Sequence, residues 1–299
     1  MKNSPRLRSR TQFIDPPDHV LLITSGGTVV APYYGRPNST DRCARSDAAP
    51  ATRHLKVVGV TTRLECVAFD ALDPAAQGTF WSTVTGWPIT VAEQDEICVE
   101  PPAGLPGVPL VFLPASNRKA GKNRMHLDLR SGSAAEQEAT VSRLCELGAT
   151  FTDVGQGDVP WTVLSDPEGN ELCVLEPRRQ YDGTGAIGAI IMDAFAPGVL
   201  ASFWSAATGW PVTHGTHDFY ALRAADGRGP YLELLRTADP KVGKNRLHVD
   251  VAPAADTDQA AEVARLRALG ATFVDVGQGD VSWTVLADPE GNEFRVLSP

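Results

Sequence analysis

Residues 147–171, LGATFTDVGQGDVPWTVLSDPEGNE, return as residues 269–293, LGATFVDVGQGDVSWTVLADPEGNE, with three of the 25 positions changed. Two more motifs precede each copy at matching spacing. They are GKNRMHLDL (121–129) with GKNRLHVDV (243–251), and FWSTVTGWP (80–88) with FWSAATGWP (203–211). The chain is therefore a tandem duplication with a repeat of about 122 residues, and a unit of that length is a whole domain.

The composition is that of a globular protein: 42% of the 299 residues are hydrophobic and 21% are charged. The formal net charge is −9, but residues 1–56 carry nine basic and four acidic side chains, which leaves 18 basic and 32 acidic ones for the rest. An acidic body argues against nucleic acid as a partner, because no basic face remains for phosphates. No apolar run approaches the length of a membrane span or a signal-peptide core, so we expect no membrane partner and a cytoplasmic protein.

Three segments follow from the repeat. Residues 1–56 have no counterpart, are rich in Arg, Ser and Pro, and are predicted to be a disordered or poorly ordered arm, although residues 19–34 could form a hairpin. Residues 57–178 and 184–299 are predicted to be two separately compact domains. The five cysteines form no CxxC and are odd in number, which argues against a disulfide framework.

The local pattern alternates strands and helices. Residues 63–71 alternate as a strand does, and Asp73 with Pro74 then predicts the start of a helix that ends at Gly86. Short strands follow, and the next module repeats the order with a strand at 124–129 and a helix from about residue 133 to Gly148. Residues 185–299 do the same again, so we expect four β-α-β-β-β modules, two in each repeat.

The ordered motifs FW-x₄-GWP, GKNR-x-H-x-D, LGAT and DPEGNE resemble the glyoxalase-like branch of the vicinal-oxygen-chelate (VOC) superfamily. The resemblance implies an α+β fold of two tandem VOC domains, each with two modules that form a cupped mixed sheet with the helices outside. It also implies that the two domains pack as a pseudo-dimer within one chain, which is a monomer or a homodimer. The ligand in such a fold is a small molecule held in the cup.

The resemblance further implies that inward-facing residues on the first and last strands of each module hold a metal. In the first domain these positions are Cys66, Val111, His126 and Cys173. In the second domain they are Ala189, Glu233, His248 and Arg295. We therefore expect Cys66, His126 and Cys173 to hold a divalent metal, with zinc favoured by two sulfurs and an imidazole. The second domain is expected to hold no metal, and its Arg295 is expected to bind an anionic group or to pair with Glu233.

Matched polar residues are the other candidates for the site. His126 and His248 are candidate acid/base catalysts, with a structural role in the cup as the alternative. The matched carboxylates are candidate ligand-binding groups, and ion pairs with Lys122, Arg124 and their copies are the alternative for the first two. They are Asp70, Asp193, Asp128 and Asp250.

Three functions remain open at this stage. The first is a glyoxalase-like lyase or isomerase, and the second is a non-catalytic binding or resistance protein for an antibiotic-type molecule. The third, an extradiol-type dioxygenase, ranks last because it needs two histidines and a glutamate in one domain, and the second domain has Ala189 where a histidine would stand.

Overall fold

The computed structural model describes residues 62–298, so the predicted N-terminal arm lies outside the described residues. The first module consists of β1 (Thr62–Ala71), α1 (Pro74–Thr85), β2 (Ile89–Ala92), β3 (Ile97–Val99) and β4 (Leu110–Pro114). The second consists of β5 (Met125–Leu129), α2 (Ala134–Glu146), β6 (Thr150–Phe151), β7 (Thr162–Ser165) and β8 (Glu171–Val174). A short 3₁₀ helix, η1 (Arg179–Tyr181), lies between the repeats.

The second repeat has the same order of elements. The third module consists of β9 (Ile187–Ala194), α3 (Pro197–Thr208), β10 (Val212–Gly215), β11 (Phe219–Leu222) and β12 (Tyr231–Arg236). The fourth consists of β13 (Leu247–Pro253), α4 (Gln259–Ala268), β14 (Thr272–Phe273), β15 (Thr284–Ala287) and β16 (Glu293–Val296). The four predicted β-α-β-β-β modules are confirmed.

Helix α1 shows why the local sequence was informative. The side chain of Asp73 accepts a hydrogen bond from the backbone N–H of Ala76 at 3.0 Å, and Pro74 occupies the first helical turn. Gly86 ends the helix in the left-handed conformation, with φ of +72°, which glycine adopts without steric cost. The predicted start and end of this helix are thus confirmed.

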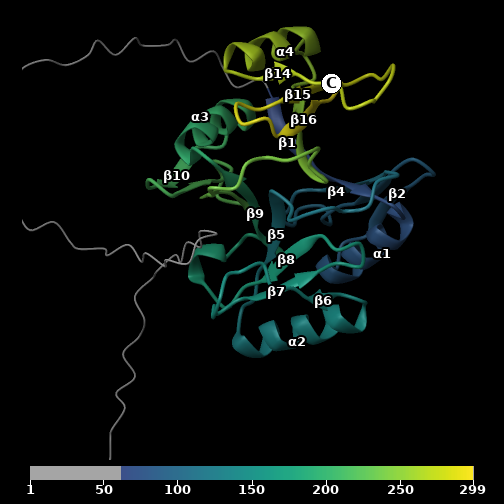
Figure 1. Cartoon of the computed structure of the whole chain (residues 1–299), viewed down its shortest axis with the longest axis vertical. Coiled ribbons are helices and arrows are strands. Elements are labelled where there is room, and N and C mark those ends of the chain that lie inside the picture. The colour runs from purple at the N-terminus through teal and green to yellow at the C-terminus, as the bar shows by residue number, and fades with distance from the viewer. Residues whose placement is uncertain (1–61, 299) are drawn as a thin grey trace, which may run out of the picture.

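The strands form two mixed sheets of eight strands each. One has the order β14-β15-β16-β13-β1-β4-β3-β2 and the other β10-β11-β12-β9-β5-β8-β7-β6. At the centre of each sheet two first strands of modules pair antiparallel, β1 with β13 and β5 with β9. Figure 1 shows α2 and α4 at opposite ends of the molecule, outside these sheets. The predicted α+β class is confirmed.

The pairing of the modules differs from the expected one. We expected the two modules of each repeat to share a sheet and a cup, but the first module pairs with the fourth and the second with the third. Each sheet therefore crosses the predicted boundary between residues 178 and 184. We call the inner face around the two central strands of each sheet the β5–β9 cup and the β1–β13 cup.

The core lies on the helix side of both sheets. One continuous cluster of buried side chains joins them, and it includes Trp81 of α1 and Trp204 of α3, which are 1% and 0% exposed. These two tryptophans, which belong to the repeated FW-x₄-GWP motifs, are therefore core residues. Two smaller apolar clusters lie apart from that core, one in each cup. That of the β5–β9 cup includes Val163, Cys173, Tyr181, Ala189 and Ile191, and that of the β1–β13 cup includes Cys66, Ala68, Cys98 and Val111.

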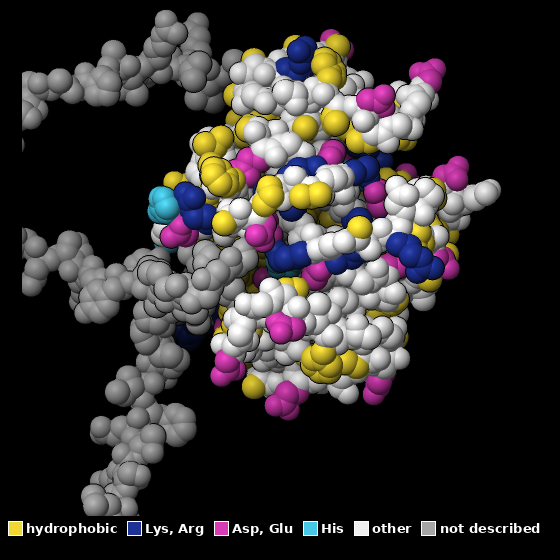
Figure 2. All heavy atoms as spheres, viewed as in Figure 1, with side chains coloured by type: hydrophobic (Ala, Val, Ile, Leu, Met, Phe, Trp, Pro, Cys, Tyr) yellow, Lys and Arg dark blue, Asp and Glu magenta, His cyan; other side chains and the backbone are white. Residues whose placement is uncertain are grey.

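The repeated GKNR and DPEGN motifs connect the two repeats. Arg246 pairs with Glu168 at 2.7 Å, and Arg124 pairs with Glu290 at 3.2 Å, so each arginine reaches a turn of the other repeat. Glu168 also accepts hydrogen bonds from the backbone N–H groups of Leu72 and Asp73 and so holds the start of α1. Figure 2 shows Lys and Arg side chains gathered across the middle of the viewed face, with Asp and Glu side chains nearby. The arginines of the GKNR motifs and the glutamates of the DPEGN turns thus hold the two repeats together.

Candidate functional site

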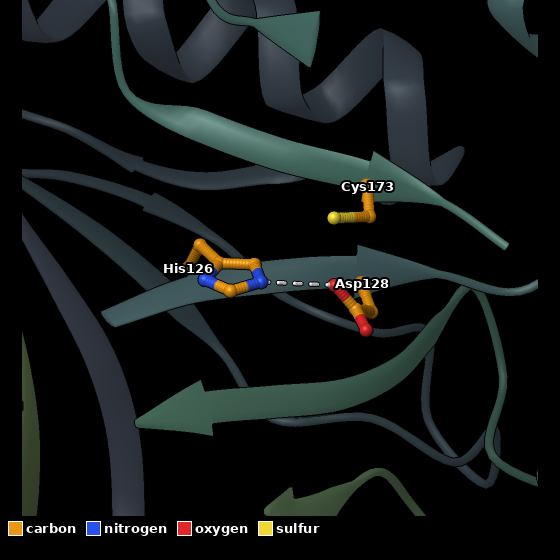
Figure 3. Close-up of side chains that lie close together, drawn as sticks. All are labelled: His126, Asp128 and Cys173. Carbon is orange, nitrogen blue, oxygen red and sulfur yellow. Dashed lines mark ion pairs between the residues drawn. The ribbon is translucent and has the colours of Figure 1, made fainter. Parts of the chain in front are cut away.

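The β5–β9 cup brings together an imidazole, a carboxylate and a thiol. His126 and Asp128 point from the same face of β5, and Cys173 lies beside Asp128 on the parallel strand β8. One ligand atom from each of the three lies within 4.8 Å of the other two. Figure 3 shows the thiol above the carboxylate, with the imidazole edge directed toward the same carboxylate.

Asp128 is incompletely satisfied in this cluster. Its Oδ1 lies 3.3 Å from Nε2 of His126, yet the two atoms make no hydrogen bond, and this buried Oδ1 has no hydrogen-bond partner in the described part of the chain. Burial, together with the charge of Asp128, raises the pKa of the Cys173 thiol well above its usual value. The cluster thus contains a buried carboxylate oxygen that accepts no hydrogen bond from the described residues, next to a protonated thiol.

A second carboxyl group lies in the same cup on β12. Glu233 is 5% exposed, and the Tyr181 hydroxyl lies 3.2 and 3.3 Å from its two oxygens, as a donor. Burial and the nearby charge of Asp128 raise the pKa of Glu233 to about 8, while the tyrosine hydrogen bond acts in the opposite direction. A carboxyl with such a pKa is available in both protonation states near neutral pH.

These groups line a cavity of about 160 Å³. His126, Asp128, Cys173 and Glu233 line it together with apolar side chains, and further charged side chains, among them Lys122, Arg178 and Arg236, line it too. The wall residues include Val154, Trp161, Val163, Leu175, Ile191, Phe219 and Leu235. The volume and the apolar walls are suited to a small organic molecule.

The β1–β13 cup holds different chemistry at matching positions. His248 and Asp250 take the places of His126 and Asp128, but Arg295 stands where Cys173 does. Nε of Arg295 donates to Oδ2 of Asp250 at 2.8 Å, and its terminal nitrogen donates to the same oxygen. Burial lowers the pKa of His248, so this imidazole is neutral at physiological pH.

The structure separates several residues that we expected to meet. Cys66 lies on β1 in the β1–β13 cup, where its Sγ is 3.5 Å from Asp250, so it does not join His126 and Cys173. Arg295 and Glu233 lie on different sheets, which corrects the expected pair between them. The physical reason is the same in both cases: the cups form between repeats, not within one.

The matched Asp70 and Asp193 have ion-pair partners from the other repeat. Lys244 pairs with Asp70, and Lys122 pairs with Asp193. Both ion pairs agree with the alternative given in the sequence analysis, in which these aspartates pair with Lys122 and with its counterpart Lys244. Asp193 also lines the cavity of the β5–β9 cup, so it lies within reach of a ligand there.

Sequence reasoning missed two residues of the site. Tyr181 and Arg178 come from the connection between the repeats, to which the sequence analysis assigns no functional residue. The Arg178 guanidinium lies 5.4 Å from the centre of the Trp161 ring, and Tyr181 is 2% exposed. A signal was present, because Tyr181 is an aromatic residue in a glycine-bearing connection, and an aromatic side chain tends to be buried.

The donor set fits a divalent metal ion. A nitrogen, an oxygen and a sulfur converge, and the orphaned Oδ1 of Asp128 is an unused acceptor that a cation would satisfy. Imidazole and thiolate favour zinc over magnesium. His126, Asp128 and Cys173 would hold the ion, which differs from the predicted set by the exchange of Cys66 for Asp128.

The fold and the site define the class of protein: paired β-α-β-β-β modules with polar residues converging inside a cupped mixed sheet are the architecture of the VOC superfamily. The Glyoxalase-like domain matches the chain twice, over residues 66–175 and 189–297, which is well over half of its length. The chain therefore belongs to the glyoxalase-like domain family.

Solved structures share this fold at low sequence identity. A putative dioxygenase from Bacillus subtilis is 16% identical, with a TM-score of 0.55 over 80% of this chain and 85% of that one. Glyoxalase I from Zea mays is 14% identical, with a TM-score of 0.55 over 80% of this chain and 92% of that one. At such identity the likeness concerns the fold alone, and no curated protein matches the sequence. In residues 62–298 no helix has the length and apolar character needed to cross a membrane.

Proposed function

We propose that the protein is a glyoxalase-like lyase or isomerase that acts on a small molecule in the β5–β9 cup. Glu233 is the observation that carries this proposal. It is a nearly inaccessible carboxyl, oriented by a tyrosine and placed in an apolar cavity beside three potential metal ligands. A buried acid of this kind costs stability, so its presence in a cavity points to a catalytic role.

In this proposal Glu233 moves a proton, and His126, Asp128 and Cys173 would hold a divalent metal ion beside it. The Tyr181 hydroxyl holds the Glu233 carboxyl in one position, and with a pKa of about 8 the carboxyl can take up a proton and return it in one cycle. A bound divalent metal would supply Lewis acidity toward substrate oxygens. The apolar walls, with Trp161 and Phe219, exclude water from the reacting atoms.

A non-catalytic binding protein is the second candidate. The apolar wall of the cavity favours it, because aromatic and aliphatic side chains bind an amphipathic molecule without any chemistry. An extradiol-type dioxygenase is not favoured, because in the described residues of the β5–β9 cup His126 is the sole histidine that lines the cavity.

Substitution of Glu233 by glutamine separates the two candidates. With a thiohemiacetal of a 2-oxoaldehyde as the substrate, we expect Glu233→Gln to lower kcat by about 10²–10⁴-fold, because the isosteric amide cannot exchange the proton. The matched control is Cys98→Ala in the β1–β13 cup. Cys98 pairs with Val111 in that cup as Ala221 pairs with Glu233 in the β5–β9 cup, so the variant introduces the residue found at the matching position. It should leave kcat unchanged. Wild-type protein that binds the compound but does not convert it would instead support the binding protein.

A further inference from the structure

The duplication supplies an internal comparison for the β5–β9 cup. Each cup carries a histidine, an aspartate two residues later and a tryptophan on the strand or loop beside them. The matched pairs are His126 with His248, Asp128 with Asp250, and Trp161 with Trp283. The two cups therefore offer the same groups at these positions, and one of their differences is the residue on the neighbouring last strand, Cys173 or Arg295, beside the aspartate.

In the β1–β13 cup that residue, Arg295, supplies the hydrogen bonds and the positive charge that the buried Asp250 needs. The backbone N–H of Arg295 donates to Oδ1 of Asp250 at 3.0 Å, and its guanidinium donates to Oδ2. The guanidinium carbon also lies 5.3 Å from the centre of the Trp283 ring, within the range of a cation–π contact. Asp250 is 0% exposed, so the arginine is its source of positive charge inside the cup.

In the β5–β9 cup the residue at the same position, Cys173, supplies neither a guanidinium hydrogen bond nor a positive charge to Asp128. Cys173 is shorter than an arginine and carries no positive charge, and Oδ1 of Asp128 has no hydrogen-bond partner among the described residues. A second buried carboxyl, Glu233, stands at the position that Val111 occupies in the other cup. Arg178 lies over the matched Trp161 of this cup at 5.4 Å, but its Nε donates to Glu176, and Oδ1 of Asp128 stays without a hydrogen-bond partner among the described residues.

We propose that Arg295 is a built-in occupant of the β1–β13 cup, so that the chain takes up one divalent ion, in the β5–β9 cup only. The guanidinium lies where the β5–β9 cup offers room to an ion and supplies the charge that an ion would supply. The identity of one residue, cysteine at 173 or arginine at 295, decides which cup is available. The predicted number of ions per chain rests on the proposed metal site, whereas the role of Arg295 does not.

Cobalt and zinc titrations of the full chain test the stoichiometry. We expect the wild type to bind one ion per chain and Arg295→Cys, which recreates the histidine, aspartate and cysteine set, to bind two. Cys173→Arg should bind none, and the double exchange should bind one. A thiolate-to-cobalt absorption band should follow the cysteine from one cup to the other. Two ions in the wild type, or one ion in a folded Arg295→Cys protein, would overturn the proposal.

A second arm needs no metal and keeps the two proposals distinguishable. Arg295→Ala should lose thermal stability and regain part of it with ethylguanidinium, which can refill the vacated place beside Asp250 and Trp283. The wild type should show no such gain in thermal stability. If Arg295→Ala folds poorly, the yield of folded protein purified with and without ethylguanidinium provides the same comparison. If the wild type binds no metal in the titrations, the proposed metal site is wrong, and the rescue experiment alone then tests the role of Arg295. If ethylguanidinium does not stabilise Arg295→Ala, the proposal for Arg295 is wrong, whereas the proposed metal site is unaffected.

Discussion

Replacement of Arg295 by methionine is expected to lower the free energy of unfolding by about 3–5 kcal/mol, because it leaves a buried carboxylate without its partner. Asp250 is fully buried and accepts from both the backbone and the guanidinium of Arg295. Methionine keeps much of the volume but supplies no charge. Urea denaturation at neutral pH, followed by tryptophan fluorescence, measures the loss.

Two companions make this measurement specific. Arg295→Met combined with Asp250→Asn should recover part of the stability, because the amide carries no charge to bury. Cys173→Met at the matched position should have a much smaller effect, since no ion pair is broken there. Equal losses in Arg295→Met and Cys173→Met would show that packing, not the ion pair, sets the stability of this position.

Glu233→Gln is expected to stabilise the metal-free protein at pH 8 while it lowers kcat. The pKa of Glu233 is raised from its usual value to about 8 in the folded state. A raised pKa means that the folded state binds the proton more tightly, so the favourable contribution is complete below the unfolded pKa and is lost as the pH rises toward 8. The neutral amide avoids this loss, and the gain should amount to roughly a few kcal/mol.

The pH dependence distinguishes this effect from a general change in packing. The difference in unfolding free energy between Glu233→Gln and the wild type should grow between about pH 5 and pH 8 and then level off. Glu138→Gln, on the exposed face of α2, serves as the control and should show little variation over this range. A difference that stays constant with pH would show that Glu233 does not titrate in the way described.

The sequence predicted the local structure well because its signals are local. Asp73, Pro74 and Gly86 define α1 through a cap, a fixed φ and a left-handed end, all within one short segment. The pairing of the modules could not be predicted in the same way. The edge of β5 can accept either β1 or β9, and the duplication has made these strands similar, so the pattern alone does not distinguish a partner in the same repeat from one in the other.

The same limit explains what was right and wrong about the site. His126 and Cys173 were correctly placed together because both belong to one module and lie on neighbouring strands. Cys66 was grouped with them only through the assumed pairing of modules. Asp128 was predicted as a ligand-binding group but not as a metal ligand, and Tyr181 was missed because the connection between the repeats has no counterpart in the described residues from which to infer its position.

The central claim is that the β5–β9 cup is the single working site of the chain. The most direct test is an anomalous difference map at the zinc edge, from crystals of the full chain grown with zinc. The account predicts one strong peak inside the cups, between His126, Asp128 and Cys173, and none beside Arg295. A peak in the β1–β13 cup, or no peak in either cup at full zinc loading, would contradict it.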